Sequence, residues 1–258
     1  MMHALTAVLA ILSAGLGLFV LGIGPAARVG IIDHQTGITL LLTLGAPVAV
    51  ACLSSLFSVG LATWRVPSLL GLTILCLVPS LIATAGLLMM KVQADAHPFI
   101  HDITTDPDNP PMIVAGADAP RANPPGYDQD AAVPNAPEGV TLYEAQEQAF
   151  PAIKPVTLKV GVEQAQALVE AALRAEGLEI ISISDVEGNP DAIRVEAVAR
   201  SRWFGFIDDV VVRIDDLSNT ESRIDIRSKS RIGLSDLGAN GNRVLALIER
   251  LSPPDPDS

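Results

Sequence analysis

Three long apolar stretches fill the first 91 residues of the chain, and the pattern of apolar and polar positions changes completely after them. The stretches without a charged residue are residues 4–27, 35–64 and 66–90. Each exceeds the roughly 20 apolar residues that a helix needs to cross a hydrocarbon core. Three such stretches in succession are rare in soluble folds, so we predict a three-helix transmembrane anchor over residues 1–91.

The first stretch has an alternative interpretation as a cleaved signal peptide. It has no Lys or Arg ahead of its apolar part, and that part is longer than a typical signal core, which favours a retained helix. Trp64 beside Arg65 is typical of residues at the headgroup level of a bilayer. No Asp, Glu, Lys or Arg lies inside the three stretches, and proton relays and ion pathways usually need such residues. The pattern therefore favours an anchor over a transporter.

The positive-inside rule gives nearly balanced evidence on orientation. With the N-terminus in the cytoplasm, the cytoplasmic side holds Arg65 and the α-amine. With the N-terminus outside, the cytoplasmic side holds Arg28 and Lys91. We predict the first arrangement, which places the C-terminal part of the chain outside the cytoplasm.

Residues 92–155 form an acidic connector that is rich in proline. Eleven of the nineteen prolines of the chain lie in it. Proline cannot continue a helix and like charges repel, so this connector is expected to be extended. Near its end, Thr141 followed by Glu144 predicts a capping box and a short helix near residues 141–150.

The chain beyond the anchor is strongly acidic. One of the 29 acids and three of the 17 bases lie within residues 1–91, which leaves 28 acids against 14 bases and a net charge of about −14. Such a charge opposes non-specific attraction to nucleic acid or anionic lipid, and we expect no nucleic-acid partner. The two cysteines lie in the apolar stretches and indicate no redox compartment.

The connector contains weak candidates for a divalent metal site. Imidazole and carboxylate groups are metal ligands, and the candidates are His97, His101, Asp102 and Asp106. Pro98 interrupts any helix that would bring both imidazoles onto one face. A locally hydrogen-bonded or exposed turn is the alternative, and we predict neither a metal nor another cofactor.

Residues 156–251 have the pattern of a compact α+β domain. The alternation of apolar residues predicts five strands and two amphipathic helices in the order β-α-β-β-β-β-α. The strands are expected at residues 156–160, 178–184, 192–201, 208–215 and 222–232, and the helices at 163–176 and from 235 or 240 to 251. An antiparallel sheet with both helices on one face would bury their apolar sides. Residues 252–258 are expected to be a disordered tail.

The expected strands have two unlike faces, because side chains alternate along a strand. The apolar face, which we expect under the helices, comprises Ile193, Val195, Ala197, Ala199, Val210, Val212, Ile214, Ile224, Ile226 and Ile232. The charged face comprises Arg194, Glu196, Arg200, Arg202, Asp209, Arg213, Asp215, Arg223, Asp225, Arg227, Lys229 and Arg231, and eight of these twelve are basic.

Three interpretations of the charged face remain open. The first and favoured one is a solvated surface with weak cross-strand ion pairs, such as Arg213 with Asp225. The second is an anion-recognition surface, since guanidinium groups bind carboxylate and phosphate well. In the third, the acidic connector folds back over the basic sheet.

Two further segments are candidates for a binding site. In Arg202–Phe206, Trp203 either fills the edge of the core or stacks on a ligand. The Gly-rich residues 233–243 precede the last helix and can present backbone N–H groups to an anion, although capping by their own polar side chains is the alternative and no nucleotide fingerprint is met. The candidate ligand-binding residues are Arg200, Arg202, Trp203, Arg213, Arg227, Arg231, Ser235, Asp236 and Asn240.

The same residues resemble a known family. The runs RSRWFGFIDDVVVRI and RIDIRSKSRIGLSDLGANGNR closely resemble the domain-of-unknown-function 1499 family of bacteria and plastids, whose motifs match Trp203–Asp209 and Asp225–Asn240. Residues 101–106 and the three spans resemble the membrane-anchored proteobacterial members. The resemblance covers about residues 97–251. It implies the fold and an envelope location, and it implies no established activity.

These observations favour a non-enzymatic protein anchored in the bacterial inner membrane, with its C-terminal domain in the periplasm. The lipid bilayer is then one partner, and an envelope or membrane protein or a small anionic ligand would bind to the α+β domain. Two alternatives are an accessory subunit of a membrane complex and a hydrolase or transferase. The enzyme would use Asp208, Asp236, Arg227, Arg231 and Ser228 or Ser230. We assign no catalytic residue, because no histidine follows His101 and no cysteine lies outside the apolar stretches.

Overall fold

The computed structural model describes residues 1–252 and divides into two compact units. The membrane unit consists of Met1–Val92 together with the loop Ser201–Gly205. The α+β unit consists of Gln93–Arg200 and the chain from Phe206 onward. The tail expected over residues 252–258 lies, beyond Ser252, outside the described residues.

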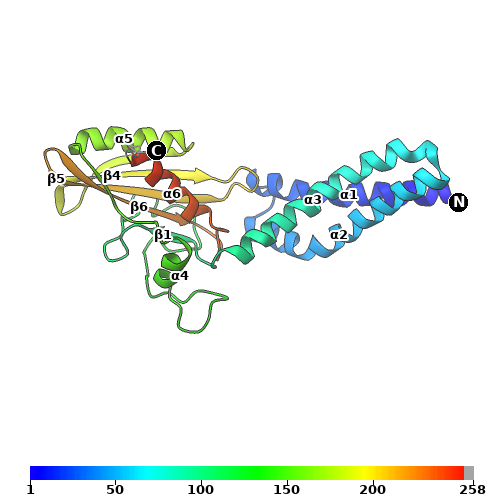
Figure 1. Ribbon diagram of the computed structural model, residues 1–258, viewed down its shortest axis with the longest axis horizontal. Coiled ribbons are helices and arrows are strands. Elements are labelled where there is room, and N and C mark those ends of the chain that lie inside the picture. Colours follow the sequence, from blue (N-terminus) through cyan, green and yellow to red (C-terminus); the bar gives the residue numbers. More distant parts are fainter. Residues whose placement is uncertain (253–258) are drawn as a thin grey trace, which may run out of the picture. The chain divides into compact units, whose positions relative to one another are not determined.

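The membrane unit contains the three predicted helices (Figure 1), α1 (Met2–Arg28), α2 (His34–Arg65) and α3 (Leu70–Ala96), with the short 3-10 turn η1 (Pro67–Leu69) before α3. All three helices are long and apolar enough to cross a membrane, which confirms the prediction of three spans. Each continues through an internal proline. Asp33 begins α2 by accepting a hydrogen bond from the backbone N–H of Thr36 at 2.8 Å.

Two local contacts shape the membrane unit. Helix α1 packs along α2 and meets α3 at Gly17, where any Cβ would clash with the backbone of Pro79 and Ser80. Glycine is therefore required for this close approach. At the end of α2, the Arg65 guanidinium carbon lies 3.7 Å from the centre of the Trp64 ring, and this tryptophan is exposed, as expected for a headgroup-level pair.

The α+β unit is built on a six-stranded antiparallel sheet. Its strands are β1 (Asp102–Thr104), β2 (Val156–Leu158), β3 (Glu179–Val186), β4 (Asn189–Arg200), β5 (Ile207–Ser218) and β6 (Glu221–Ser230). Their spatial order is β1-β6-β5-β4-β3, and β2 also pairs with β6. The helices are α4 (Leu142–Ala149), α5 (Val162–Ala175) and α6 (Ala239–Leu251). From β2 to α6 the elements follow the predicted order, and the α+β fold class is confirmed.

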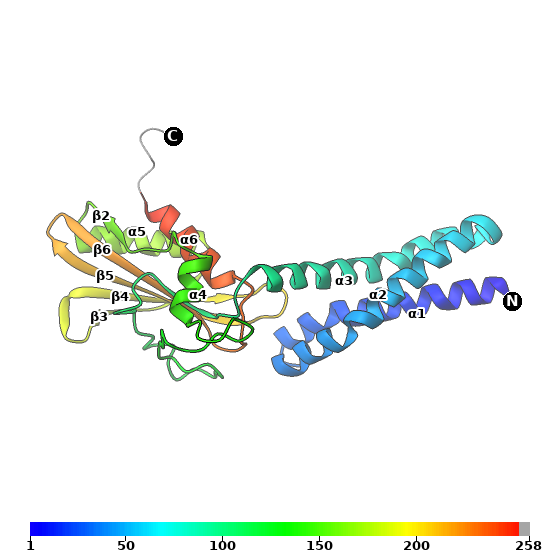
Figure 2. The same cartoon turned by 60° about the horizontal axis from the view of Figure 1, so that its bottom comes forward.

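Helices α5 and α6 cover one face of the sheet (Figures 1 and 2). Helix α5 packs on β4 and β5, and α6 packs on β6. Beneath them lie the apolar side chains predicted for this face, including Val195, Val210 and Ile226, each fully buried. The period-two pattern of the strands therefore located this part of the core correctly.

The connector contributes to the same core. Its residues Ile100, Ile103, Phe150 and Ile153 are buried in the main hydrophobic cluster, and β1 pairs with β6 between Arg227 and Lys229. In α4, the capping box of Thr141 and Glu144 has both of its hydrogen bonds. Residues 93–155 thus form part of the folded α+β unit.

Candidate functional site

The charged face of the sheet is buried beneath the connector. Of its side chains, Glu196, Asp209, Arg213, Asp225, Arg227 and Lys229 belong to residues that are at most 8% exposed. The favoured interpretation of a solvated surface is therefore wrong. The acidic connector folds back over the basic strands, which was the third interpretation.

Arg227 lies at the centre of this buried layer. Its guanidinium forms two parallel hydrogen bonds with Asp102 of β1, from Nε to Oδ1 and from Nη2 to Oδ2, both 2.9 Å long. Lys229 reaches the same carboxylate at 2.8 Å. The two cations also donate to the backbone carbonyl oxygens of Pro111, Pro125 and Gly126. Two positive groups thus share one carboxylate, and main-chain oxygens accept further hydrogen bonds from both.

Tyr127 borders this cluster, with its ring centre 5.4 Å from the Arg227 guanidinium carbon. Burial, and secondarily the charge of Asp102, raise the pKa of the Tyr127 hydroxyl far above its usual range. The phenol is therefore neutral at every physiological pH.

A second cluster surrounds Arg213. Its guanidinium contacts Asp225 at 2.8 Å and Asp215 at 2.7 Å, and it reaches Asp106 of the connector at 3.3 Å. Arg223 contacts Asp106 and Asp225 at 2.8 and 2.9 Å. The predicted Arg213–Asp225 pair is confirmed, but it is buried and belongs to a network.

Asp209 and Glu196 complete the layer. Asp209 forms an ion pair with Arg231 at 2.7 Å and a second ion pair with Arg121 of the connector. The Glu196 carboxylate accepts hydrogen bonds from three successive backbone N–H groups, those of residues 114–116, at 2.9 to 3.3 Å. The connector backbone is thereby fixed to β4.

The charges show why the connector is needed. Arg194 also pairs with Glu196 at 3.3 Å. With this pair, the sheet side chains in the ion pairs within the described residues 1–252 are six bases and four acids, a net charge of +2. The connector adds two acids and one base, Asp102, Asp106 and Arg121, which lowers the excess to +1. An uncompensated charge in this buried position would be costly, so the connector carboxylates make the burial of the basic strands possible.

The Gly-rich turn before α6 is occupied by its own side chains. The Asp236 carboxylate accepts hydrogen bonds from the N–H groups of Gly238 and Asn240, at 2.8 and 2.9 Å. Ser235 Oγ accepts from the N–H of Leu237 at 3.2 Å. Burial raises the pKa of the Asp236 carboxyl, although these two hydrogen bonds oppose the shift. The N–H groups of Gly238 and Asn240, which an external anion would need, are therefore already bound to Asp236.

Ser228, Ser230 and Asn240 form one polar network beneath α6. Ser228 donates to the Asn240 side-chain oxygen at 2.6 Å, and the Asn240 amide donates to Ser230 Oγ at 2.9 Å and to the carbonyl of His101 at 3.1 Å. Arg243 joins Ser228 to Asp208, at 2.8 Å to each. These contacts attach α6 to β6 and β5.

The metal candidates are engaged in different contacts. His97 stacks on Phe150, with its Nδ1 3.0 Å from the carbonyl of Gln93. Asp102 and Asp106 bind the bases described above. Among residues 1–252, no group of three or more His, Cys, Asp or Glu side chains is placed to hold a metal ion.

Trp203 and Arg202 lie in a different place from the other predicted site residues. Both belong to the loop of the membrane unit, whereas Arg200 is exposed at the end of β4. The Trp203 indole N–H donates to the carbonyl of Leu21 at 3.2 Å, and its ring rests on Gly24, where a Cβ would clash with it. The Arg28 guanidinium donates to the backbone carbonyls of Ser201 and Arg202.

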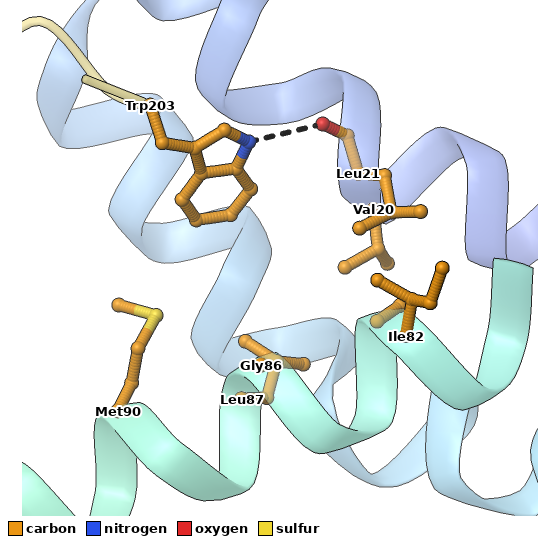
Figure 3. Close-up of a pocket in the computed structure, with 8 residues that line it drawn as sticks. Val20, Leu21, Ile82, Gly86, Leu87, Met90 and Trp203 are labelled. Atoms are coloured by element: carbon orange, nitrogen blue, oxygen red, sulfur yellow. Dashed lines mark hydrogen bonds between the residues drawn. The ribbon is translucent and has the colours of Figure 1, made fainter.

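Trp203 forms one wall of an apolar pocket, shown in Figure 3. The pocket has a volume of about 290 Å³, and its other lining residues are Val20 and Leu21 of α1 and Ile82, Ala83, Gly86, Leu87 and Met90 of α3. Helices α1 and α3 meet closely at Gly17. In the pocket, the small residues Ala83 and Gly86 leave the space between the two helices unfilled. Ile82 and Met90 are about 12 Å apart along the helix axis. The space therefore has the elongated, apolar lining that suits a hydrocarbon chain.

Comparison with known families agrees with this fold. A family model described as "Protein of unknown function (DUF1499)" matches residues 102–251. The chain belongs to this family. The matched region begins at β1 and so includes the connector residues that cover the charged face. None of the curated proteins matches the chain.

The connector contains apolar residues that indicate its burial. Ile100, Ile103 and Ile113 lie in a segment rich in proline and acids, and all three are buried. Of these, Ile103 lies in β1 between Asp102 and Thr104. The pocket had no comparable signal, because its wall comes from residues more than a hundred positions apart.

Proposed function

We propose that this protein is a non-enzymatic envelope protein, anchored in the membrane, that binds the acyl chain of a bilayer lipid in the Trp203 pocket. The observation that carries the proposal is the pocket itself, an apolar space between two spanning helices with a fixed indole as its wall. Lipid acyl chains are the apolar molecules that surround such helices. An ordered chain would fill the space that the small residues of α3 leave open.

The arrangement of the polar side chains supports a role without catalysis. Each residue considered for a hydrolase or transferase already has a structural partner. Ser228 and Ser230 bind Asn240, Asp236 caps α6, and Asp208 binds Arg243. The side-chain partners of these serines are the Asn240 amide and, for Ser228, the protonated Arg243 guanidinium. Neither group can take the hydroxyl proton, which is typical of a structural serine.

The proposed binding site does not lie on the charged face of the sheet. Arg213, Arg227 and Arg231 bind internal carboxylates, so binding of an anion there would first have to separate the connector from the strands. We therefore favour the membrane unit as the place where a ligand binds.

The proposed location is the bacterial inner membrane, with the α+β unit in the periplasm. It is supported by the anchor and by our prediction of a cytoplasmic N-terminus. Protease added to intact spheroplasts should cleave an epitope-tagged C-terminus in this orientation. Protection of the tag until the membrane is lysed would instead place the domain in the cytoplasm.

Fluorescence quenching by brominated lipid tests the pocket directly. The Trp64→Phe variant leaves Trp203 as the single tryptophan of the chain. In nanodiscs that contain lipids brominated along the acyl chain, we expect strong quenching of Trp203. Gly86→Leu places a side chain in open space within the pocket, and it should reduce this quenching at least twofold.

Gly71→Leu is the matched control, because Gly71 also lies in α3 in open space but does not line the pocket. It should leave the quenching unchanged. Equal quenching in all three proteins would mean that Trp203 meets only bulk lipid, and the proposal would then be rejected.

A further inference from the structure

Three basic residues of the membrane unit lie at the end that carries the pocket. Arg28 ends α1, Lys91 follows the lining residue Met90, and Arg202 precedes Trp203. Asp33, the one acid among residues 1–92 and 201–205, begins α2 at the same end. Asp95 follows Lys91 by one turn in α3, so three bases and two acids give a local net charge of +1. Arg65 and the α-amine lie at the opposite end of the helices.

This local charge has the opposite sign to the rest of the chain. The whole protein carries a formal charge of −12, which opposes non-specific binding to an anionic membrane surface. Bases next to the hydrocarbon region nevertheless attract anionic headgroups within about a Debye length. At the end of the helices where the pocket lies, such a base can attract the headgroup of a lipid whose acyl chain occupies the pocket.

Arg202 and Arg28 have different surroundings. The Arg28 guanidinium is directed at the backbone carbonyls of Ser201 and Arg202 and so holds the loop in place. The Arg202 side chain is exposed, on the residue next to the indole that lines the pocket. A guanidinium in this position can form the paired hydrogen bonds that a phosphate oxygen pair accepts.

We infer that the lipid in the Trp203 pocket is an anionic phospholipid. One acyl chain occupies the pocket, and the headgroup phosphate binds the Arg202 guanidinium. This inference rests on the proposed function, because it specifies the headgroup of the lipid whose chain the pocket takes.

The test compares two brominated lipids with identical chains, phosphatidylglycerol and phosphatidylcholine, in nanodiscs of the Trp64→Phe protein. Phosphatidylglycerol should quench Trp203 at a mole fraction about fivefold lower than phosphatidylcholine. Arg202→Gln should abolish this preference while leaving the quenching by phosphatidylcholine unchanged. Arg65→Gln, which removes a base at the other end of the helices, is the matched control and should preserve the preference.

The outcomes separate the two proposals. Equal quenching by both lipids, with sensitivity to Gly86→Leu retained, overturns the headgroup assignment and leaves the acyl-chain site intact. A preference that Arg65→Gln reduces as much as Arg202→Gln also overturns it, because it would then reflect only surface potential. Quenching that is insensitive to Gly86→Leu rejects the acyl-chain site and the inference together.

Discussion

The two faces of the β-sheet are both buried, but by different physical means. Helices α5 and α6 cover the apolar face, and the connector covers the charged face with ion pairs and hydrogen bonds. Burial of an apolar side chain is favourable wherever water is excluded. Burial of a charge is tolerated only where a partner of opposite charge or an aligned dipole lies in reach. The charged face therefore depends on individual side chains, and the apolar face on the sum of many contacts.

The largest expected effect comes from removing the carboxylate that two buried cations share. Asp102→Asn keeps the shape of the side chain but leaves Arg227 and Lys229 without their common counter-charge. We expect a loss of about 3–5 kcal/mol in the free energy of unfolding of the α+β unit. Urea denaturation of the detergent-solubilised chain, followed by circular dichroism, measures it.

Asp118→Asn is the matched control, since this connector carboxylate is exposed. It should change the free energy of unfolding by less than about 0.5 kcal/mol. Similar small values for both variants would show that the ion pairs of the charged face contribute little to stability.

A somewhat smaller loss is expected on the apolar face. Leu173 of α5 is fully buried, and Leu173→Ala should cost about 2–5 kcal/mol through lost transfer free energy and the cavity that remains. Leu168→Ala on the same helix removes a side chain that is 44% exposed and should cost clearly less. The same urea titration compares them, and equal losses would contradict the assignment of the helix face.

The smallest effect is a pH dependence at His101, the residue before β1. Burial, with the nearby charge of Lys229, lowers the pKa of His101 below its ordinary value of 6.5, although Asp102 opposes the shift. The unfolded chain therefore takes up a proton more readily than the folded chain. The contribution of His101 to stability is complete above pH 6.5 and is lost as the pH falls through the lower pKa of the folded state.

Urea denaturation between pH 7.5 and 5.0 should show a shallower loss of stability in His101→Gln than in the parent protein. The difference between the two slopes should be less than about 1.4 kcal/mol per pH unit. Parallel curves would show that protonation of His101 is not linked to folding.

The sequence predicted the elements that have a regular period. Three apolar stretches gave the spans, and alternation along β4, β5 and β6 gave the apolar face, including Val195, Val210 and Ile226. Family motifs at Trp203–Asp209 and Asp225–Asn240 were identified from the same residues. Local periodicity suffices for these features because each is encoded within one segment.

The burial of the charged face could not be derived in this way. The alternation along β6 places Arg227 on the charged face, but it does not show whether the guanidinium is solvated or bound to Asp102. These two residues are 125 positions apart in the chain. Solvated and paired charges look alike in a sequence, so only the path of the connector distinguishes them. For the same reason the sequence could not show that the predicted site residues belong to two units. Trp203 lies in the membrane unit, and Arg227 lies beneath the connector in the α+β unit.

The membership of the loop Ser201–Gly205 in the membrane unit has a consequence for biogenesis. A ribosome makes α1, α2 and α3 first, and Trp203 emerges only after β4 has been synthesised. During that interval the helices can already enter the bilayer, while the space beside Leu21 and Met90 still lacks its indole wall. For the lipid proposed above, this order of translation leaves the space between the helices accessible before Trp203 is synthesised.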